Sequence, residues 1–319
     1  MTEFNLGRTV WITAGAAALL IAVLIFLRFR RDIREDYRRL EAGQQRVVET
    51  DCGPIQFASR GTGQPVVVVH GIFGGYDQGL MTAEGQFGEG FHLLVPSRFG
   101  YLGSPLPPEA SPEKQADALA CLLDARGIEQ AAVLGTSAGG TAAVQFAIRH
   151  PDRCSGLILV SSNAPGESVG LPPESAAKIM FRSDFLFWVL TRGFPRTMYS
   201  IMGVPGDFEL TPAQREEMDR VMQTVMPVKP RAEGALFDMY VSNPAINEVD
   251  PGSITVPTLV IHAQDDPLAD FENARAMVEA IPDARLVDFE RGGHPLLGHG
   301  EEIRSEIAAF LGRTQAAAE

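Results

Sequence analysis

The chain has 319 residues, of which 45% are hydrophobic and 21% are charged. This composition is typical of a globular protein rather than a disordered one, and the length suits one large domain or two smaller ones. The formal net charge of −13 argues against a nucleic-acid partner, because phosphate binding needs a basic face.

An apolar run without any charge occupies residues 10–27. Its length of about 18 residues just reaches that needed to cross a bilayer. A cleaved signal peptide fits less well, because only Arg8 precedes the run and no small-x-small cleavage site follows it. A buried core helix also fits less well, because the run has no polar face. We therefore expect a short tail at 1–9 and a transmembrane helix at 10–27.

Arginines flank this run unequally, since one precedes it and six follow it: Arg28, Arg30, Arg31, Arg34, Arg38 and Arg39. Positively charged flanks stay on the cytoplasmic side of a membrane. The sequence therefore predicts a single-pass membrane protein whose large domain faces the cytoplasm. A basic linker over 28–45, helical to near Gly43, would join the two parts.

Strands and helices alternate from residue 46 onward. Alternating segments around Gly53-Pro54 predict an antiparallel hairpin. The run Pro65–His70 is rich in valine and has no polar face, which is typical of a strand covered by helices on both sides. Further strands are predicted at 91–95, 131–134, 156–160, 258–262 and 285–289, and helices at 111–126, 138–150, 271–281 and 301–311. The pattern indicates an α/β fold with a mostly parallel sheet flanked by helices.

The stretch 165–250 interrupts this alternation. It contains helical segments at 174–187, 211–226 and 231–241, broken by prolines and glycines, and no clear strand. This pattern predicts a helical cap inserted into a core formed by 46–164 and 251–319. Four aromatic residues are expected to pack inside the cap, with an acyl pocket or a bilayer contact as the alternative for some of them: Phe181, Phe185, Phe187 and Trp188.

The three cysteines, Cys52, Cys121 and Cys154, form neither an even set nor a CxxC pair. The sequence therefore predicts no disulfide framework and no zinc site. Cys121 and Cys154 lie in apolar surroundings and are expected to be unpaired and buried. Unpaired cysteines favour a reducing compartment.

A G-x-S-x-G pentapeptide lies at 135–139, directly between a predicted strand and a predicted helix. In that context a sharp turn exposes Ser137 as a nucleophile, while Gly135 and Gly139 let neighbouring segments approach closely. The helix N-terminus adds free N–H groups near a developing oxyanion. A serine that merely caps the helix is the alternative interpretation.

A second glycine-rich segment, HGIFGG at 70–75, follows the valine-rich strand directly. Glycines there permit a turn whose backbone N–H groups face the substrate. We expect the N–H groups of Ile72 and Ala138 to form an oxyanion hole, with His70 and Gly71 as part of the supporting motif. His70 is not expected to be the catalytic base, because it precedes the nucleophile and lies on this loop.

A serine nucleophile needs a base, and the base needs a partner that orients it. His294, on the glycine-rich loop after the strand predicted at 285–289, is the expected base. Asp265 and Asp266 both follow the strand predicted at 258–262, at the sheet edge where α/β sites lie, and Asp266 is preferred. Three other histidines are expected to have structural, surface or capping roles: His92, His262 and His299.

These segments together resemble the α/β-hydrolase superfamily, in its helical-cap branch, over nearly all of the soluble part. The resemblance rests on HGIFGG at 70–75, GTSAGG at 135–140, VPTLVIHAQDDP at 256–267 and GGHPLLGH at 292–299. It implies a triad of Ser137, Asp266 and His294, because the family's acid follows a pattern close to H-G-x-x-D and its histidine follows Gly-Gly. The chain departs from the family at Ser97, where many relatives carry aspartate, and at Ala263, where glycine is usual.

The resemblance implies a serine hydrolase that needs no metal or organic cofactor. Relatives of this fold that use an aspartate nucleophile, haloalkane dehalogenases and epoxide hydrolases, are disfavoured by Ser137. The expected substrate is a small-molecule or lipid-like acyl compound, most simply a lipophilic carboxylic ester. The alternatives are a C–C bond, amide or thioester hydrolase on the same scaffold, and a non-catalytic binding protein that kept the fold.

Overall fold

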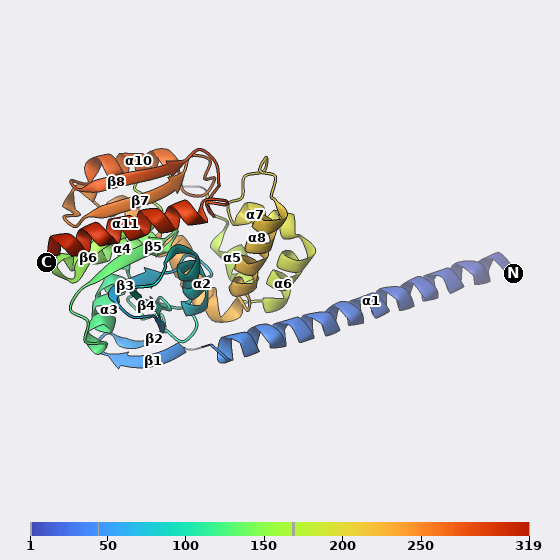
Figure 1. The fold of residues 1–319 in the computed structure, drawn as a ribbon. Coiled ribbons are helices and arrows are strands. Elements are labelled where there is room, and N and C mark those ends of the chain that lie inside the picture. Colours follow the sequence, from blue (N-terminus) through green and yellow to red (C-terminus); the bar gives the residue numbers. More distant parts are fainter. Residues whose placement is uncertain (1, 44, 168–169, 319) are drawn as a thin grey trace. The chain divides into compact units, whose positions relative to one another are not determined.

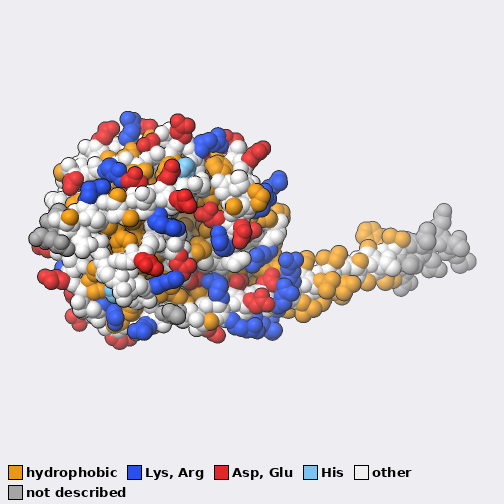
Figure 2. All heavy atoms as spheres, viewed as in Figure 1, with side chains coloured by type: hydrophobic (Ala, Val, Ile, Leu, Met, Phe, Trp, Pro, Cys, Tyr) orange, Lys and Arg blue, Asp and Glu red, His pale blue; other side chains and the backbone are white. Residues whose placement is uncertain are grey.

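The computed structural model describes residues 2–43, 45–167 and 170–318 and divides into two units, residues 1–43 and 44–319 (Figure 1). In the first unit, helix α1 runs without a break over Thr2–Glu41, which corresponds to about 60 Å. It is long and apolar enough to cross a membrane. Figure 2 shows apolar side chains along this helix and basic side chains near its C-terminal end.

The predicted tail and linker are parts of the same helix. Residues 2–9 are helical rather than a tail, and the segment 28–41, which lacks glycine and proline, continues the helix to Glu41. Ion pairs one turn apart, Arg28–Asp32 and Arg31–Glu35, stabilise this charged part modestly.

The second unit contains an eight-stranded sheet in the order β1-β2-β4-β3-β5-β6-β7-β8. β1 pairs antiparallel with β2, and β2 with β4, while the other neighbouring strands run parallel. The predicted hairpin and the mostly parallel sheet are therefore confirmed. The strands are β1 (Gln45–Thr50), β2 (Gly53–Arg60), β3 (Gln64–Val69), β4 (Phe91–Pro96), β5 (Ala131–Thr136), β6 (Cys154–Val160), β7 (Thr258–Ala263) and β8 (Ala284–Phe289).

Helices cover both faces of the sheet (Figure 1). They are α2 (Tyr76–Gln86), α3 (Pro112–Ala125), α4 (Gly139–Arg149), α10 (Phe271–Ala280) and α11 (Gly300–Ala318). The valines of β3 alternate between the faces: Val67 and Val69 pack with α3, α4 and α10, whereas Val66 and Val68 pack with α2 and α11. Because both faces of β3 are buried, its sequence has no polar side. The helix α2 was not predicted, and Gly79 within it weakens the helical pattern.

The chain between β6 and β7, residues 161–257, is called the inserted segment below, and the predicted cap lies within it. Its described residues form helices and no strand: α5 (Glu174–Phe181), α6 (Asp184–Gly193), α7 (Pro195–Ile201), α8 (Pro212–Val225), α9 (Ala232–Phe237), a π-helical turn (Asp238–Ser242) and short 3-10 helices at Lys229–Arg231, Pro244–Glu248 and Pro251–Ser253.

Two helices of the inserted segment differ from prediction. The single helix expected at 174–187 is two helices, because the Ser183 hydroxyl accepts the Leu186 N–H and starts a new one. The helix expected at 231–241 is divided among a 3-10 turn, α9 and the π-helical turn. The helix α8 begins after Thr211 with a reciprocal capping box to Gln214.

A disulfide joins Cys52, in the turn between β1 and β2, to Cys121 of α3. The prediction that the cysteines are unpaired is therefore wrong for these two, whereas Cys154 is buried and free as expected. The sequence does not predict this disulfide, because the two cysteines are 69 residues apart and meet only when α3 packs beside β1. Because disulfides are typical of oxidising compartments, the cysteines no longer support a reducing compartment.

Candidate active site

Ser137 lies in the turn between β5 and α4, where the backbone is strained. Its φ of 52° is in the left-handed region, which costs a residue other than glycine about 1–2 kcal/mol. The Ser137 N–H donates to the carbonyl of Val160, which fixes the turn against β6. A Cβ at Gly139 would lie 2.3 Å from the Val69 carbonyl oxygen, so only glycine fits there. Neighbouring β-strands thus hold the turn that projects Ser137.

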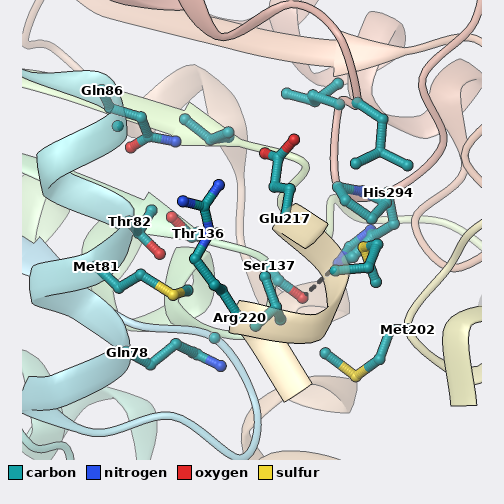
Figure 3. Close-up of a pocket in the computed structure, with 18 of the residues that line it drawn as sticks. Gln78, Met81, Thr82, Gln86, Thr136, Ser137, Met202, Glu217, Arg220 and His294 are labelled. Atoms are coloured by element: carbon teal, nitrogen blue, oxygen red, sulfur yellow. Dashed lines mark hydrogen bonds between the residues drawn. The ribbon is translucent and has the colours of Figure 1, made fainter. Parts of the chain in front are cut away.

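Ser137 belongs to a chain of hydrogen bonds with two residues from other strand ends. The His294 Nε2 lies 2.8 Å from the Ser137 Oγ, and the His294 Nδ1 lies 2.8 Å from the Asp266 Oδ2. Asp266 follows β7 and His294 follows β8, so parallel strands deliver all three residues to one edge of the sheet. Ser137 and His294 both line a cavity, and Figure 3 shows their side chains pointing toward one another.

The carboxylate of Asp266 is held by several donors. Its Oδ1 accepts the N–H groups of Leu268 and Ala269 at 2.8 and 3.0 Å, and its Oδ2 lies 3.4 Å from the His262 Nε2. Burial acts to raise the pKa of Asp266, but the charge of His294 and these hydrogen bonds outweigh it and hold the pKa well below its usual value. The neighbouring Asp265 has a different partner, because its Oδ1 accepts the Gly293 N–H at 2.7 Å.

His70 and His299 have partners away from this chain of three, and His70 is buried. The His70 Nδ1–H donates to the Gly71 carbonyl at 2.8 Å, and its Nε2 accepts the Arg98 N–H at 3.0 Å. Burial and the nearby Arg98 charge hold the pKa of His70 well below its usual value, so the ring is neutral. His299 stacks on Phe289.

Two backbone N–H groups beside Ser137 are available to a ligand. Neither the Ile72 N–H nor the Ala138 N–H has a hydrogen-bond partner among the residues that the structure describes. Ile72 lies on the cavity wall with Ser137, and a Cβ on Gly71 would be only 3.2 Å from the Ser137 Cβ. The HGIFGG loop (residues 70–75) therefore lies directly beside Ser137.

A cavity of about 490 Å³ opens beside Ser137 and His294. Most of its wall is apolar, with side chains from α2, the inserted segment and the chain around the start of α11: Met81, Ile201, Met202, Met218, Leu296 and Ile303. Phe73 also lines it and stacks edge-on against Phe181, with 4.8 Å between the ring centroids. The aromatic residues of the predicted cap are mostly buried, as expected, although Phe185 remains 39% exposed.

One part of the cavity is polar. Glu217 and Arg220 of α8 reach into it in Figure 3. Partial burial raises the pKa of Glu217, with Arg220 acting in the opposite direction. Thr136 and Gln86 also line the cavity, and each has a buried side-chain oxygen without a hydrogen-bond partner within the described residues. This polar region could receive a charged or hydrogen-bonding part of a ligand.

Sequence reasoning missed several buried charged residues around the HGIFGG loop, namely Arg98, Arg231 and Asp238. Their only signal in the sequence is the departure at Ser97-Arg98, which does not indicate what Arg98 contacts. Within the described ranges, no group of three or more His, Cys, Asp or Glu side chains could hold a metal ion.

Comparison with known proteins places this site in a family. A family model described as the alpha/beta hydrolase fold matches residues 64–300. An uncharacterized hydrolase, YcgS, of Bacillus subtilis is 29% identical and covers 84% of this chain and 98% of its own. A 2-hydroxymuconate semialdehyde hydrolase of Pseudomonas putida is 26% identical over 81% of this chain and 90% of its own. A solved structure of a bacterial membrane phospholipase A, 20% identical, has the same fold, with a TM-score of 0.61 and 99% of each chain covered. The sheet, the strand-end site and the matching family model together show that this chain belongs to the α/β-hydrolase family of enzymes.

Proposed function

We propose that this hydrolase acts through a covalent acyl-enzyme on Ser137. The observation that carries the proposal is the unbroken chain of hydrogen bonds from the Ser137 Oγ through His294 to Asp266, with 2.8 Å at each step. A nucleophile, a base and a group that orients the base are what this chemistry requires.

In the proposed mechanism the His294 Nε2 removes the Ser137 proton while the Oγ attacks an acyl carbonyl. The Ile72 and Ala138 N–H groups stabilise the oxyanion, and each such donor is worth about 3 kcal/mol of the barrier. Asp266 keeps the proton of the neutral imidazole on Nδ1 and stabilises the imidazolium that forms. The imidazolium protonates the leaving group, and a water molecule activated by His294 then releases the acyl group from Ser137.

The proposed substrate is a lipophilic carboxylic ester. The mainly apolar wall of the cavity favours a hydrocarbon group beside Ser137. The long apolar helix α1 would keep the enzyme at a membrane, where such esters concentrate. The fold relative named as a membrane phospholipase A acts on a substrate of this class by its name, which is consistent with the proposal.

A second candidate is a C–C bond hydrolase that acts on an acidic substrate, and amide or thioester cleavage would use the same three residues. Arg220 favours the acidic substrate, because a guanidinium in the cavity could bind a carboxylate. The relative from Pseudomonas putida is named for a muconate semialdehyde, which is itself a carboxylate.

The side of the membrane is also a proposal. The arginines after the apolar run predict a cytoplasmic domain, whereas the Cys52–Cys121 disulfide is typical of the opposite side. Fusion of the C-terminus to alkaline phosphatase, or separately to green fluorescent protein, decides between them. Fluorescence without phosphatase activity supports the arginine rule, and the reverse result overturns it.

The test of the proposed function is hydrolysis of p-nitrophenyl esters from short to long acyl chains by the full chain in detergent micelles. Ser137→Ala is the control for the nucleophile. We expect turnover of one length class by the parent and none above background by the variant. Equal activity in both proteins would refute Ser137 as the nucleophile. Inactivity of the parent on all esters, with cleavage of a C–C or amide substrate, would favour the second candidate.

A further inference from the structure

Two buried arginines contact the HGIFGG loop. Arg98 follows β4 and is 1% exposed, and Arg231 lies in the inserted segment and is 0% exposed. Charged side chains are almost never fully buried unless they are paired. Two of them on one six-residue loop are therefore a costly arrangement that needs a reason beyond packing.

Arg98 fixes the first peptide units of the loop. Its Nε donates to the His70 carbonyl at 2.9 Å, and its Nη2 donates to the Gly71 carbonyl at 3.3 Å. The His70 ring donates to the same Gly71 carbonyl at 2.8 Å. The Gly71 C=O and the Ile72 N–H belong to one trans peptide unit, in which these two bonds point in opposite directions. Donors that fix the Gly71 carbonyl therefore also fix the direction of the Ile72 N–H.

Asp238, in the π-helical turn of the inserted segment, holds Arg98 in this position. Its two carboxylate oxygens each accept from the Arg98 guanidinium at 2.5 Å, and the Tyr101 hydroxyl donates to it at 2.5 Å. Burial acts to lower the pKa of Arg98, but the Asp238 charge outweighs it and raises the pKa, so Arg98 stays charged. Asp238 itself is 0% exposed.

Arg231 also joins the HGIFGG loop to an ion pair, but here the arginine belongs to the inserted segment and the acid to the core. It extends from the inserted segment, donates to the Gly74 carbonyl at 2.5 Å, and pairs with Asp77 of α2 at 2.8 and 3.0 Å. One ion pair thus has its arginine in the core and its acid in the inserted segment, and the other has the reverse. Between them they hold loop carbonyls at His70, Gly71 and Gly74.

We propose that Asp238, acting through Arg98, is a positioning residue for the oxyanion hole, so that the seating of the inserted segment sets the direction of the Ile72 N–H. This inference rests on the proposed serine hydrolase function. Without the Asp238 charge, Arg98 is a buried cation that lacks its counter-ion and must move or hydrate. The Gly71 carbonyl then loses one of its three donors and keeps the His70 ring and the Gly74 N–H, at 2.8 and 3.2 Å. The alignment of the Ile72 N–H with the oxyanion therefore becomes weaker. Substrate binding before oxyanion formation is not affected.

The test uses Asp238→Asn in the full-length protein, with Asp117→Asn as the matched control. Asp117 also forms a two-point pair with an arginine, Arg149, but both side chains are partly exposed, and neither forms a hydrogen bond to the HGIFGG loop within the described residues. For each protein the concentration of active sites is titrated with a fluorophosphonate, and kcat and KM are measured with the best p-nitrophenyl ester. The Ki of an alkyl trifluoromethyl ketone, which forms a tetrahedral oxyanion on a serine, is measured alongside.

We expect Asp238→Asn to lower kcat per active site and to raise the ketone Ki by a common factor of about tenfold to a hundredfold. KM should stay near the parental value, because the lost interaction is made only with the oxyanion. Asp117→Asn should change neither quantity. A purely structural role for Asp238 would reduce the number of titrated sites but leave the ketone Ki of those sites unchanged, and that result would overturn the inference.

If Asp238→Asn fails to fold, Tyr101→Phe replaces it, because this change removes only one donor to Asp238. It should raise the ketone Ki in the same direction by a smaller factor, and a parental Ki would again overturn the inference. A parent protein that neither hydrolyses an ester nor binds the ketone overturns the proposed function and this inference together. An active parent with an unchanged Ki in the variants overturns this inference alone.

Discussion

Replacing Asp266 by asparagine tests the assignment of the triad acid most directly. In the parent, the Asp266 Oδ1 accepts two backbone N–H groups, from Leu268 and Ala269, so an asparagine oxygen would keep that position. The asparagine NH2 group would then take the place of Oδ2, which lies 2.8 Å from the His294 Nδ1. Because the NH2 group is a donor, it would favour the tautomer of His294 that has no proton on Nδ1.

The consequence lies at the other nitrogen of the ring. A His294 with its proton on Nε2, 2.8 Å from the Ser137 Oγ, cannot accept the serine proton. In another serine hydrolase fold this substitution lowers kcat by about 10⁴, which corresponds to about 5.5 kcal/mol of barrier. We expect a loss of this order for Asp266→Asn, with little change in KM.

Asp265→Asn is the matched control, since the two residues are adjacent. Its Oδ1 accepts the Gly293 N–H, and an asparagine oxygen can do the same. We expect its kcat to fall by less than about tenfold. The assay is ester hydrolysis by both variants, normalised to folded protein by circular dichroism. A large loss in Asp265→Asn together with near-parental activity in Asp266→Asn would refute the argument.

Three further predictions concern stability, each measured by chemical denaturation. Gly139→Ala should lower the free energy of unfolding by about 3 kcal/mol, because its Cβ would lie 2.3 Å from a backbone oxygen. The control is Gly88→Ala, where the added Cβ faces open space and should change the free energy of unfolding by less than about 0.5 kcal/mol. Equal effects of the two substitutions would contradict this reasoning. The pKa of Asp266 is lowered in the folded protein, so its charge contributes stability that is complete above the unfolded-state pKa near 4 and is lost as pH falls further. The difference in unfolding free energy between the parent and Asp266→Asn should therefore decline as pH falls below about 4, and a difference that does not change there would contradict this reasoning. Reduction of the Cys52–Cys121 disulfide, which closes a loop of 69 residues, should lower the free energy of unfolding by about 4 kcal/mol in the chain-entropy description, and no change on adding reductant would mean that the bond does not form.

The sequence by itself determined the elements whose signals are local. The valine run of β3, the Ser111 cap of α3 and the strand-turn-helix pattern around Ser137 are each set by a few neighbouring residues. Periodicity and end signals of this kind depend on whether a face is buried and on whether helix ends are capped, and both can be recognised without knowing the partner. The α/β fold, the hairpin and the parallel sheet followed from these signals.

The tertiary structure decided which distant groups meet. It brings Asp266, and not Asp265, to His294, pairs Cys52 with Cys121, and seats Asp238 on Arg98 across 140 residues of sequence. The contacts of Cys52 with Cys121 and of Asp238 with Arg98 leave no local pattern, because a carboxylate or a thiol looks the same in sequence whether its partner is near or absent. Burial then gives each contact its effect, since an ion pair such as Arg98–Asp238 fixes a loop only where water cannot compete for either charge.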